Sequence, residues 1–252
     1  MRRILLFALV LLPSLSPAQT TATFQNAPNG FGYTGGQDTD LSAKLPNTNL
    51  STASGVGIGR VSNFVNRPLF RFDLSSIARA YSSITQIQFT LTEVQPPAGA
   101  DTLLLHEVDA LNSNWIETSA TWNTKDGTNA WDGGVGLGAS GYGSVLDSES
   151  YTSSTTSITF TITGPAATNL VNDFTSASNP GFVITSLNET TGNNNFYFET
   201  GTLDSGSSKP KLSITYVPAP EPAATGLLIG GLAAVGLRRR RREVGRGTGG
   251  YL

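Results

Sequence analysis

Apolar and polar side chains alternate with a period of two residues through the middle of the chain. The clearest runs are residues 87–92, 158–163 and 211–216. Successive side chains of a β-strand point to opposite faces of the sheet, so each run predicts a strand with one buried and one solvated face. We expect further strands at residues 69–74, 103–108, 182–187 and 195–200, separated by clusters of Gly, Asn, Pro and Ser.

One segment has a helical pattern instead. Pro165 suits the first turn of a helix, and Ala166, Leu170, Val171 and Phe174 fall on one helical face. Many short strands with a single short helix predict an all-β fold, an antiparallel β-sandwich or jelly roll. We assign this fold to residues 19–217, a length that suits one domain.

The composition narrows the possible chemistry. The chain has no Cys, 1 His, 28 Gly and 13 Pro, and only 13% of its residues are charged. The absence of Cys excludes disulfides and thiolate nucleophiles, and a single His excludes a zinc site built from several histidines. Ser, Thr, Asn and Gly take the place of charged residues, a composition common on surfaces that contact sugars.

The net charge of −2 hides an uneven distribution. Residues 19–219 hold 8 basic and 16 acidic side chains, which gives this region a net charge of −8. Such a body repels phosphate backbones, and we therefore predict no binding to nucleic acid.

The first 18 residues have the pattern of a secretory signal peptide. Arg2 and Arg3 precede an apolar run from Ile4 to Leu12, and small residues lead up to Ala18. The apolar run is too short to span a membrane as a stable helix. We predict that residues 1–18 form a signal helix that directs export.

Residues 218–242 combine a proline-rich spacer, an uncharged stretch and a basic cluster. Ala223 to Leu237 carry no charge, and Arg238 to Arg242 follow directly. A helix of this length reaches about 22 Å against a hydrocarbon core of about 30 Å, so it predicts a short transmembrane helix that needs bilayer thinning or arginine snorkelling. The arginines place their end on the cytoplasmic side, and we expect residues 243–252 to be a disordered tail.

This end of the chain resembles the PEP-CTERM sorting signal of Gram-negative bacteria. The matching residues are Pro220, Glu221 and Pro222, the apolar stretch after them, and the cluster that begins with Arg238, Arg239 and Arg240. The resemblance implies recognition by an exosortase-type membrane protease, transient anchoring in the inner membrane, and delivery to the cell surface or extracellular matrix. Such signals usually end near the arginines, whereas residues 243–252 follow them here. A plain C-terminal anchor is the alternative.

Three blocks within residues 37–217 stand out from the strand pattern. The most specific block is W-x-E-x-x-x-T-W-N at residues 115–123, with Trp131, Gly133 and Gly134 behind it. The weaker blocks are residues 38–50 with 67–76, and residues 196–200 with 209–216. Together they resemble the DNRLRE family of secreted β-sandwiches, which are similar to carbohydrate-binding modules, although the six-letter string that names the family is absent. The resemblance implies a role in binding polysaccharide, since some related modules bind polymers of uronic acid.

Aromatic side chains are the candidates for contact with sugar rings, whose C–H faces pack on indoles. The candidate glycan-binding residues are Trp122 and, in a flexible glycine loop, Trp131 and Tyr142. The alternative is that large aromatic residues brace the core, which we favour for Trp115 and Trp122. For Trp131 and Tyr142 both interpretations stay open.

Asp38 and Asp40 are the candidate ligands of a calcium ion, which takes about six to eight oxygen atoms. The alternative is that both are solvated residues of a turn. Arg71 and Asp73 share one face of a predicted strand, and we expect both to pair with the neighbouring strand. Apart from calcium, no cofactor is expected.

Carboxylates offer an enzymatic alternative. Glu107 and Glu117, with Asp109 or Asp73, would act as acid and base in a glycan hydrolase or lyase if two of them face each other across a cleft. His106 points to the opposite face of its strand from Glu107, so the two form no dyad, and we expect His106 at a strand surface or edge.

These features predict an exported surface or matrix protein, without catalysis, whose β-sandwich binds polysaccharide. Two alternatives stay open. One is a purely structural matrix protein with no affinity for glycans, and the other is a carboxylate-based polysaccharide hydrolase or lyase.

Overall fold

The structure is a computed structural model that describes residues 18–27, 32–53, 55–78, 81–176, 178–191, 194–199 and 208–219. Three predicted segments lie outside these residues. They are the signal peptide apart from Ala18, the sorting segment from Pro220 onwards, and the tail. Within the described ranges, no helix is long and apolar enough to cross a membrane.

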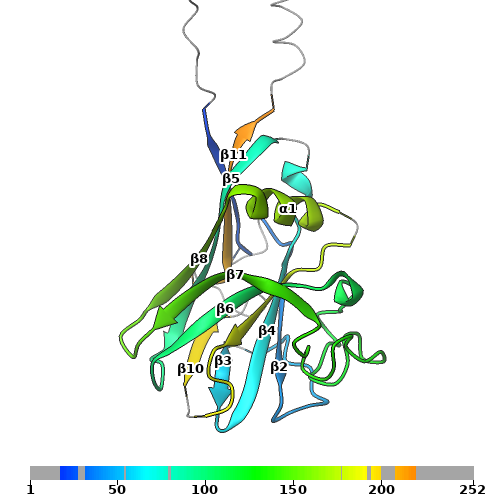
Figure 1. The fold of residues 1–252 in the computed structure, drawn as a ribbon, viewed down its shortest axis with the longest axis vertical. Coiled ribbons are helices and arrows are strands. Elements are labelled where there is room, and N and C mark those ends of the chain that lie inside the picture. The colour runs from blue at the N-terminus through cyan, green and yellow to red at the C-terminus, as the bar shows by residue number, and fades with distance from the viewer. Residues whose placement is uncertain are drawn as a thin grey trace, which may run out of the picture.

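The described residues form one curled, antiparallel sheet of 11 strands with one α-helix against it (Figure 1). One half of the sheet has the order β1–β11–β5–β8, and β5 also pairs with β10, which begins the other half. The bounds in the first half are β1 Thr20–Phe24, β11 Lys211–Pro218, β5 Tyr81–Gln95 and β8 Ser157–Thr163.

The second half has the order β10–β3–β4–β9–β6–β7, and β2 also pairs with β4. The bounds are β10 Asn195–Glu199, β3 Gly55–Val61, β4 Phe64–Phe72, β9 Phe182–Ser186, β6 Asp101–Val108, β7 Tyr142–Tyr151 and β2 Gly36–Ser42.

The three runs with the clearest alternation lie side by side in the first half. Phe89 of β5 stands opposite Phe160 of β8 and Leu212 of β11, and all three side chains are buried. The opposite faces of these strands carry Thr, Ser and Gln, as the pattern predicts. The four strands predicted at residues 69–74, 103–108, 182–187 and 195–200 are also confirmed. Their ends agree with the prediction to within two residues, except that β4 already begins at Phe64.

The larger of two apolar clusters, the inner core, lies between the two halves of the sheet. Phe89 is at its centre, with ring centroids 4.9 Å from Phe70 and 5.4 Å from Phe182. Complete burial of such a side chain stabilises the fold by about 1.5–3 kcal/mol. Aromatic side chains from both halves therefore hold the curled sheet together.

The predicted helix is confirmed as α1, Gly164–Phe174, which covers one end of the inner core (Figure 1). Leu170, Val171 and Phe174 are buried as predicted. Ala166 is exposed, and Ala167 takes the expected buried position. In the first turn, the buried face is thus one residue further along the chain than the sequence pattern indicated.

Four strands carry too weak a pattern to be predicted, namely β1, β2, β3 and β7. In β3, glycine is required by close packing: a Cβ on Gly57 would lie 2.6 Å from Val61. At Gly59, which has a φ of +88°, a Cβ would lie 2.7 Å from the carbonyl oxygen of Asn194. Glycine is depleted in strands generally, so it conceals this strand from a pattern search.

A second apolar cluster, the outer core, lies on the other face of the second half-sheet. Phe70 and Leu69, successive residues of β4, belong to the inner and the outer core respectively. Residues 109–141, which we call the tryptophan loop, cover this face. The buried members of the outer core are Leu41, Leu69, Val108, Trp115, Ala120, Trp131, Leu137 and Val183.

Two short 3₁₀ helices complete the described structure. One is η1, Ser75–Ile77, which follows β4. The other is η2, Ala110–Asn112, which opens the tryptophan loop, where the Asp109 carboxylate accepts a hydrogen bond from the Leu111 amide at 2.9 Å.

Candidate functional site

The tryptophan block at residues 115–123 holds the outer core in place. The Trp115 side chain is 1% exposed, and its Nε1 donates to the Pro180 carbonyl at 2.9 Å. The guanidinium of Arg71 stacks on the Trp115 ring, 4.2 Å from its centroid. The prediction that Trp115 is a core residue is confirmed.

Glu117 of the same block caps an edge of the sheet. Its Oε1 accepts a hydrogen bond from the Asp38 amide of β2 at 3.0 Å. The side-chain amide of Asn49 donates to the carbonyls of Glu117 and Ala120, at 2.7 and 2.8 Å. Burial raises the pKa of Glu117. This glutamate therefore has a structural partner and joins the tryptophan loop to β2.

Trp131 does not offer a surface to sugars. Its side chain is 4% exposed, and its Nε1 donates to the Thr121 carbonyl at 2.8 Å. Stacking on a sugar needs an exposed indole face. The structure therefore contradicts the glycan-contact interpretation of Trp131 and places this residue in the outer core.

Trp122 and Tyr142 are half-buried at the margin of the outer core. The Trp122 ring lies so close over Gly136 that a Cβ there would come within 2.4 Å of it. Tyr142 is the first residue of β7 and thus lies on a strand and not in a flexible loop, and its ring centroid is 4.4 Å from that of His106. Of the three predicted glycan-binding residues, Trp122 and Tyr142 are therefore the two whose side chains are partly exposed.

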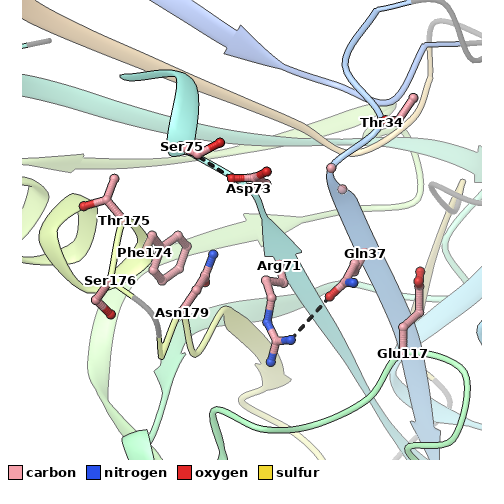
Figure 2. A pocket seen from close by; sticks show the side chains of 12 residues that line it. Thr34, Gln37, Arg71, Asp73, Ser75, Glu117, Phe174, Thr175, Ser176 and Asn179 are labelled. Atoms are coloured by element: carbon pink, nitrogen blue, oxygen red, sulfur yellow. Dashed lines mark hydrogen bonds between the residues drawn. The ribbon is translucent and has the colours of Figure 1, made fainter. Parts of the chain in front are cut away.

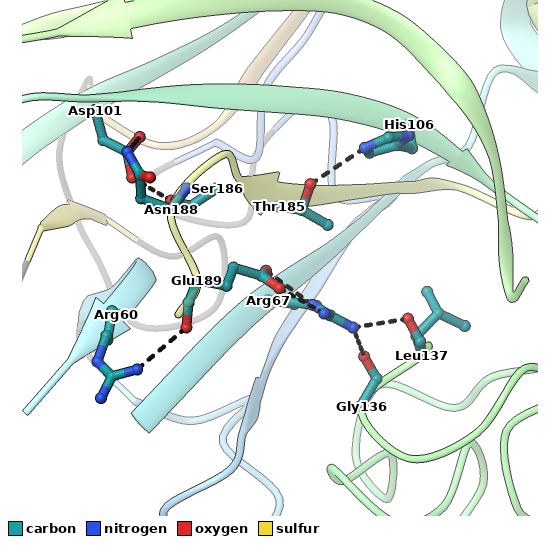
Figure 3. A network of polar contacts seen from close by, with 10 residues as sticks. All are labelled: Arg60, Arg67, Asp101, His106, Gly136, Leu137, Thr185, Ser186, Asn188 and Glu189. Atoms are coloured by element: carbon teal, nitrogen blue, oxygen red, sulfur yellow. Dashed lines mark hydrogen bonds and ion pairs between the residues drawn. The ribbon is translucent and has the colours of Figure 1, made fainter. Parts of the chain in front are cut away.

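Arg67 ties the tryptophan loop to the sheet. It forms a two-point ion pair with Glu189, at 2.9 and 2.6 Å, and its Nη1 donates to the carbonyls of Gly136 and Leu137 (Figure 3). Its guanidinium carbon also lies 5.8 Å from the centre of the Trp122 ring. Arg67 is thus engaged in holding the fold.

His106 is buried, at 6% exposure, and the prediction of a surface or edge position is wrong. Its Nδ1 lies 3.0 Å from the Gly143 carbonyl and its Nε2 lies 3.2 Å from Thr185 Oγ1, as Figure 3 shows in part. Strands β7 and β9 flank β6 on both sides and enclose the ring. Burial lowers the pKa of His106, which favours a neutral, structural imidazole.

Asp38 and Asp40 are buried on β2, so the prediction of solvated turn residues is wrong. Asp40 stands opposite Pro68, and its Oδ1 has no hydrogen-bond partner. Burial raises the pKa of Asp40. No group of three or more His, Cys, Asp or Glu side chains placed to hold a metal occurs in the described part of the chain, so these two carboxylates lack further acidic ligands.

A pocket of about 520 Å³, which we call the Arg71 pocket, opens between β2, the end of β4 and the end of α1. Figure 2 shows Arg71 hydrogen-bonded to Gln37 and Asp73 hydrogen-bonded to the Ser75 amide. Gln37 is the register partner of Arg71 on β2, which confirms the predicted cross-strand pairing of that arginine. Asp73 lies beyond the paired residues of β4 and lines the pocket.

The Arg71 guanidinium also braces the tryptophan loop. It donates to the Ser113 carbonyl at 2.5 Å and to the Trp115 carbonyl at 3.3 Å. Burial lowers the pKa of Arg71 to about 10, so the group stays charged at neutral pH. Glu117 lines the same pocket, which therefore carries positive, negative, amide and hydroxyl groups.

A smaller pocket of about 230 Å³, the acidic pocket, contains Glu107, Asp109 and Asp173. Burial, followed by the charges of Asp173 and Asp109, raises the pKa of Glu107 to about 7. The segment after α1 separates the two pockets: Ser176 lines the Arg71 pocket and Ser178 lines the acidic one. The four carboxylates of the enzymatic alternative thus divide between the pockets, Glu107 with Asp109 and Glu117 with Asp73.

Sequence reasoning missed most of this site. Gln37 and Ser176 of the Arg71 pocket and Asp173 of the acidic pocket carried no motif. Each joins its pocket only because segments that are distant in the sequence pack together. In comparisons with known proteins, no family model matches the chain and no similar curated protein is found.

Proposed function

We propose that this is an exported surface or matrix protein whose β domain, a sandwich or jelly roll, binds polysaccharide in the Arg71 pocket. The observation that supports it is a pocket of about 520 Å³ lined by groups that donate and accept hydrogen bonds. Sugar hydroxyls do both, and a volume of this order suits a small ligand or one unit of a chain. The charged Arg71 would also favour a sugar that carries a carboxylate.

Export and sorting belong to the two ends of the chain. Residues 1–18 would act as the signal peptide, and residues 218–242 as a sorting signal for an exosortase-type protease. β1 pairs with β11, so both ends join the domain through adjacent strands (Figure 1). Replacing Arg238 to Arg242 with Ser should leave the protein mislocalised, measured by fractionation of cells. Unchanged delivery to the surface would contradict the sorting role.

Two matched variants test the binding site. Ser176 and Ser178 are both exposed, two residues apart, and line different pockets. In affinity gels that contain acidic or neutral polysaccharides, the unmodified chain should be retarded. Ser176→Trp fills the Arg71 pocket and should weaken binding at least about tenfold, whereas Ser178→Trp should bind normally.

Other outcomes of these gels favour the alternatives. No retardation by any polysaccharide would contradict the binding proposal and favour a structural matrix protein. If Ser178→Trp loses binding and Ser176→Trp does not, the ligand binds in the acidic pocket and not in the Arg71 pocket.

The acidic pocket supports a second candidate, a glycan hydrolase or lyase. A carboxyl group with a pKa of about 7 is a suitable general acid at neutral pH, and Asp109 or Asp173 would supply the anionic partner of Glu107. Release of reducing ends or unsaturated products that Glu107→Gln abolishes would establish this activity. Activity that survives Glu107→Gln, or no product from any polysaccharide, would reject it.

A further inference from the structure

The sheet has four edge strands in the described part of the chain, namely β1, β2, β7 and β8. The backbone N–H and C=O groups on the outer side of an edge strand have no partner strand, so they offer a template for another chain. Proteins usually protect such an edge with charged side chains, bulges or a covering segment. Three of these four edges are protected in one of these ways, and β1 is not.

Carboxylates protect the edges formed by β2, β8 and β7. On β2, the Asp38 amide donates to Glu117 Oε1 of the tryptophan loop at 3.0 Å. On β8, the Thr161 amide donates to Asp147 Oδ2 at 2.6 Å. Strand β7 carries Asp147 and Glu149, and its register with β6 shifts twice. Each of these edges therefore resists pairing with a further strand.

Strand β1 has none of these features. Its five residues, Thr20–Phe24, include no charge and no proline, and they pair with β11 without a register shift. Within the described ranges, β11 is the one strand that β1 pairs with, and no side chain forms a hydrogen bond to the β1 backbone. Thr20, Thr21 and Thr23 are exposed. The outer side of β1 is thus open to a partner strand.

Threonine pairs on the same half of the sheet indicate which partner fits. The Oγ1 atoms of Thr21 on β1 and Thr215 on β11 lie 3.0 Å apart, and so do those of Thr90 on β5 and Thr159 on β8. Such pairs across adjacent antiparallel strands stabilise a sheet. A threonine-rich strand without charge would continue this arrangement outwards, and β1 itself is such a strand.

We propose that β1 pairs antiparallel with β1 of a second copy of this chain. A twofold axis at Ala22 places Thr21 of each copy opposite Thr23 of the other, and no like charges meet although residues 19–219 have a net charge of −8. A contact of five residues is small, so we expect a reversible dimer. Because β1 and β11 lead to the two ends of the chain (Figure 1), these ends would point in opposite directions in the two copies. The pairing therefore suits copies released into a matrix or held on facing surfaces, and it does not depend on glycan binding.

Spin labels test which edge forms the contact. The chain has no Cys, so one introduced Cys carries a label at a unique position in the full chain, studied in detergent solution. Thr23→Cys labels β1, and Thr161→Cys is the matched control on β8, because the register places Thr23, Ser213, Gln88 and Thr161 in one row. Two labels on paired β1 strands lie at diagonal positions about 7–8 Å apart and should broaden each other's spectrum. Labels on β8, three strands further out in each copy, should lie about 30 Å apart and stay sharp. Equal broadening of both labels, broadening of the β8 label alone, or none at about 100 µM chain would overturn the proposal.

A pair of charge variants tests the twofold arrangement and stays informative if a label disturbs β1. One variant combines Thr21→Lys with Thr23→Lys, and the other combines Thr21→Glu with Thr23→Glu. Like charges then stand opposite each other, so each variant alone should dimerise at least about tenfold more weakly than the unmodified chain in sedimentation equilibrium. An equal mixture of the two variants brings opposite charges together and should dimerise again. Dimers that persist in either variant alone, or a mixture that stays monomeric, would contradict pairing through β1.

Discussion

The inner and outer cores share the second half of the sheet, which separates them, but they are held together by different forces. The inner core is a set of apolar side chains on strands of alternating pattern, with Phe89 at its centre. The outer core lies under an irregular loop, and side-chain hydrogen bonds to backbone fix it, such as those from Trp115, Trp131 and Asn49. The backbone groups of a regular strand are hydrogen-bonded to the neighbouring strands, whereas those of an irregular loop need side chains as partners.

The largest effect is expected in the inner core. Phe89→Ala removes a ring that contacts Phe70 and Phe182 and leaves a cavity between the sheet halves. The free energy of unfolding should fall by about 3–5 kcal/mol, measured by urea denaturation. Phe64→Ala is the control, because Phe64 is 42% exposed and its loss should cost little. Equal losses in the two variants would contradict this description of the inner core.

The pH dependence of stability shows whether a charge on Asp40 is tolerated on the face of β2 that lies toward the inner core. Burial raises the pKa of Asp40, so the folded chain holds the proton more tightly than the unfolded chain does. Its contribution to stability is complete below about pH 4 and is lost as the pH rises through the folded pKa. Asp40→Asn should remove this dependence and raise the free energy of unfolding at pH 8, by on the order of 2 kcal/mol.

Asp126→Asn is the control for that measurement. Hydrogen bonds from Asn129 lower the pKa of Asp126, which gives the opposite sign. This variant should gain nothing at pH 8. If Asp40→Asn shows the same pH dependence as the unmodified chain, the charge on Asp40 is compensated in the folded state.

A smaller and more local effect is expected in the outer core. Asn49→Ala removes the two hydrogen bonds that hold the carbonyls of Glu117 and Ala120. The cost should be about 1–2 kcal/mol, and amide hydrogen exchange should become faster in residues 109–141 while the inner core stays protected. Asn47→Ala, which removes an exposed bond to Asn123, should change little. Faster exchange throughout the sheet would show that the two cores open together.

Strands β5, β8 and β11 of the inner core could be predicted because apolar residues alternate with polar ones along each of them. β3 could not, since its glycines serve close packing and carry no apolar pattern. The tryptophan block did mark residues that stabilise the fold, but it did not show that Trp131 faces the outer core and not solvent. The Arg71 pocket was out of reach, because Gln37, Arg71 and Ser176 come from distant segments that meet only in the folded chain.

Hydrogen exchange with a bound oligosaccharide tests the proposed function most directly. The ligand is cut from whichever polysaccharide retards the chain in affinity gels. The amides of residues 34–37 and 174–176, around the Arg71 pocket, should become protected, while those of residues 107–110, in the acidic pocket, should not change. Protection confined to the acidic pocket, or to the exposed margin around Trp122 and Tyr142, would contradict the assignment of the Arg71 pocket as the binding site.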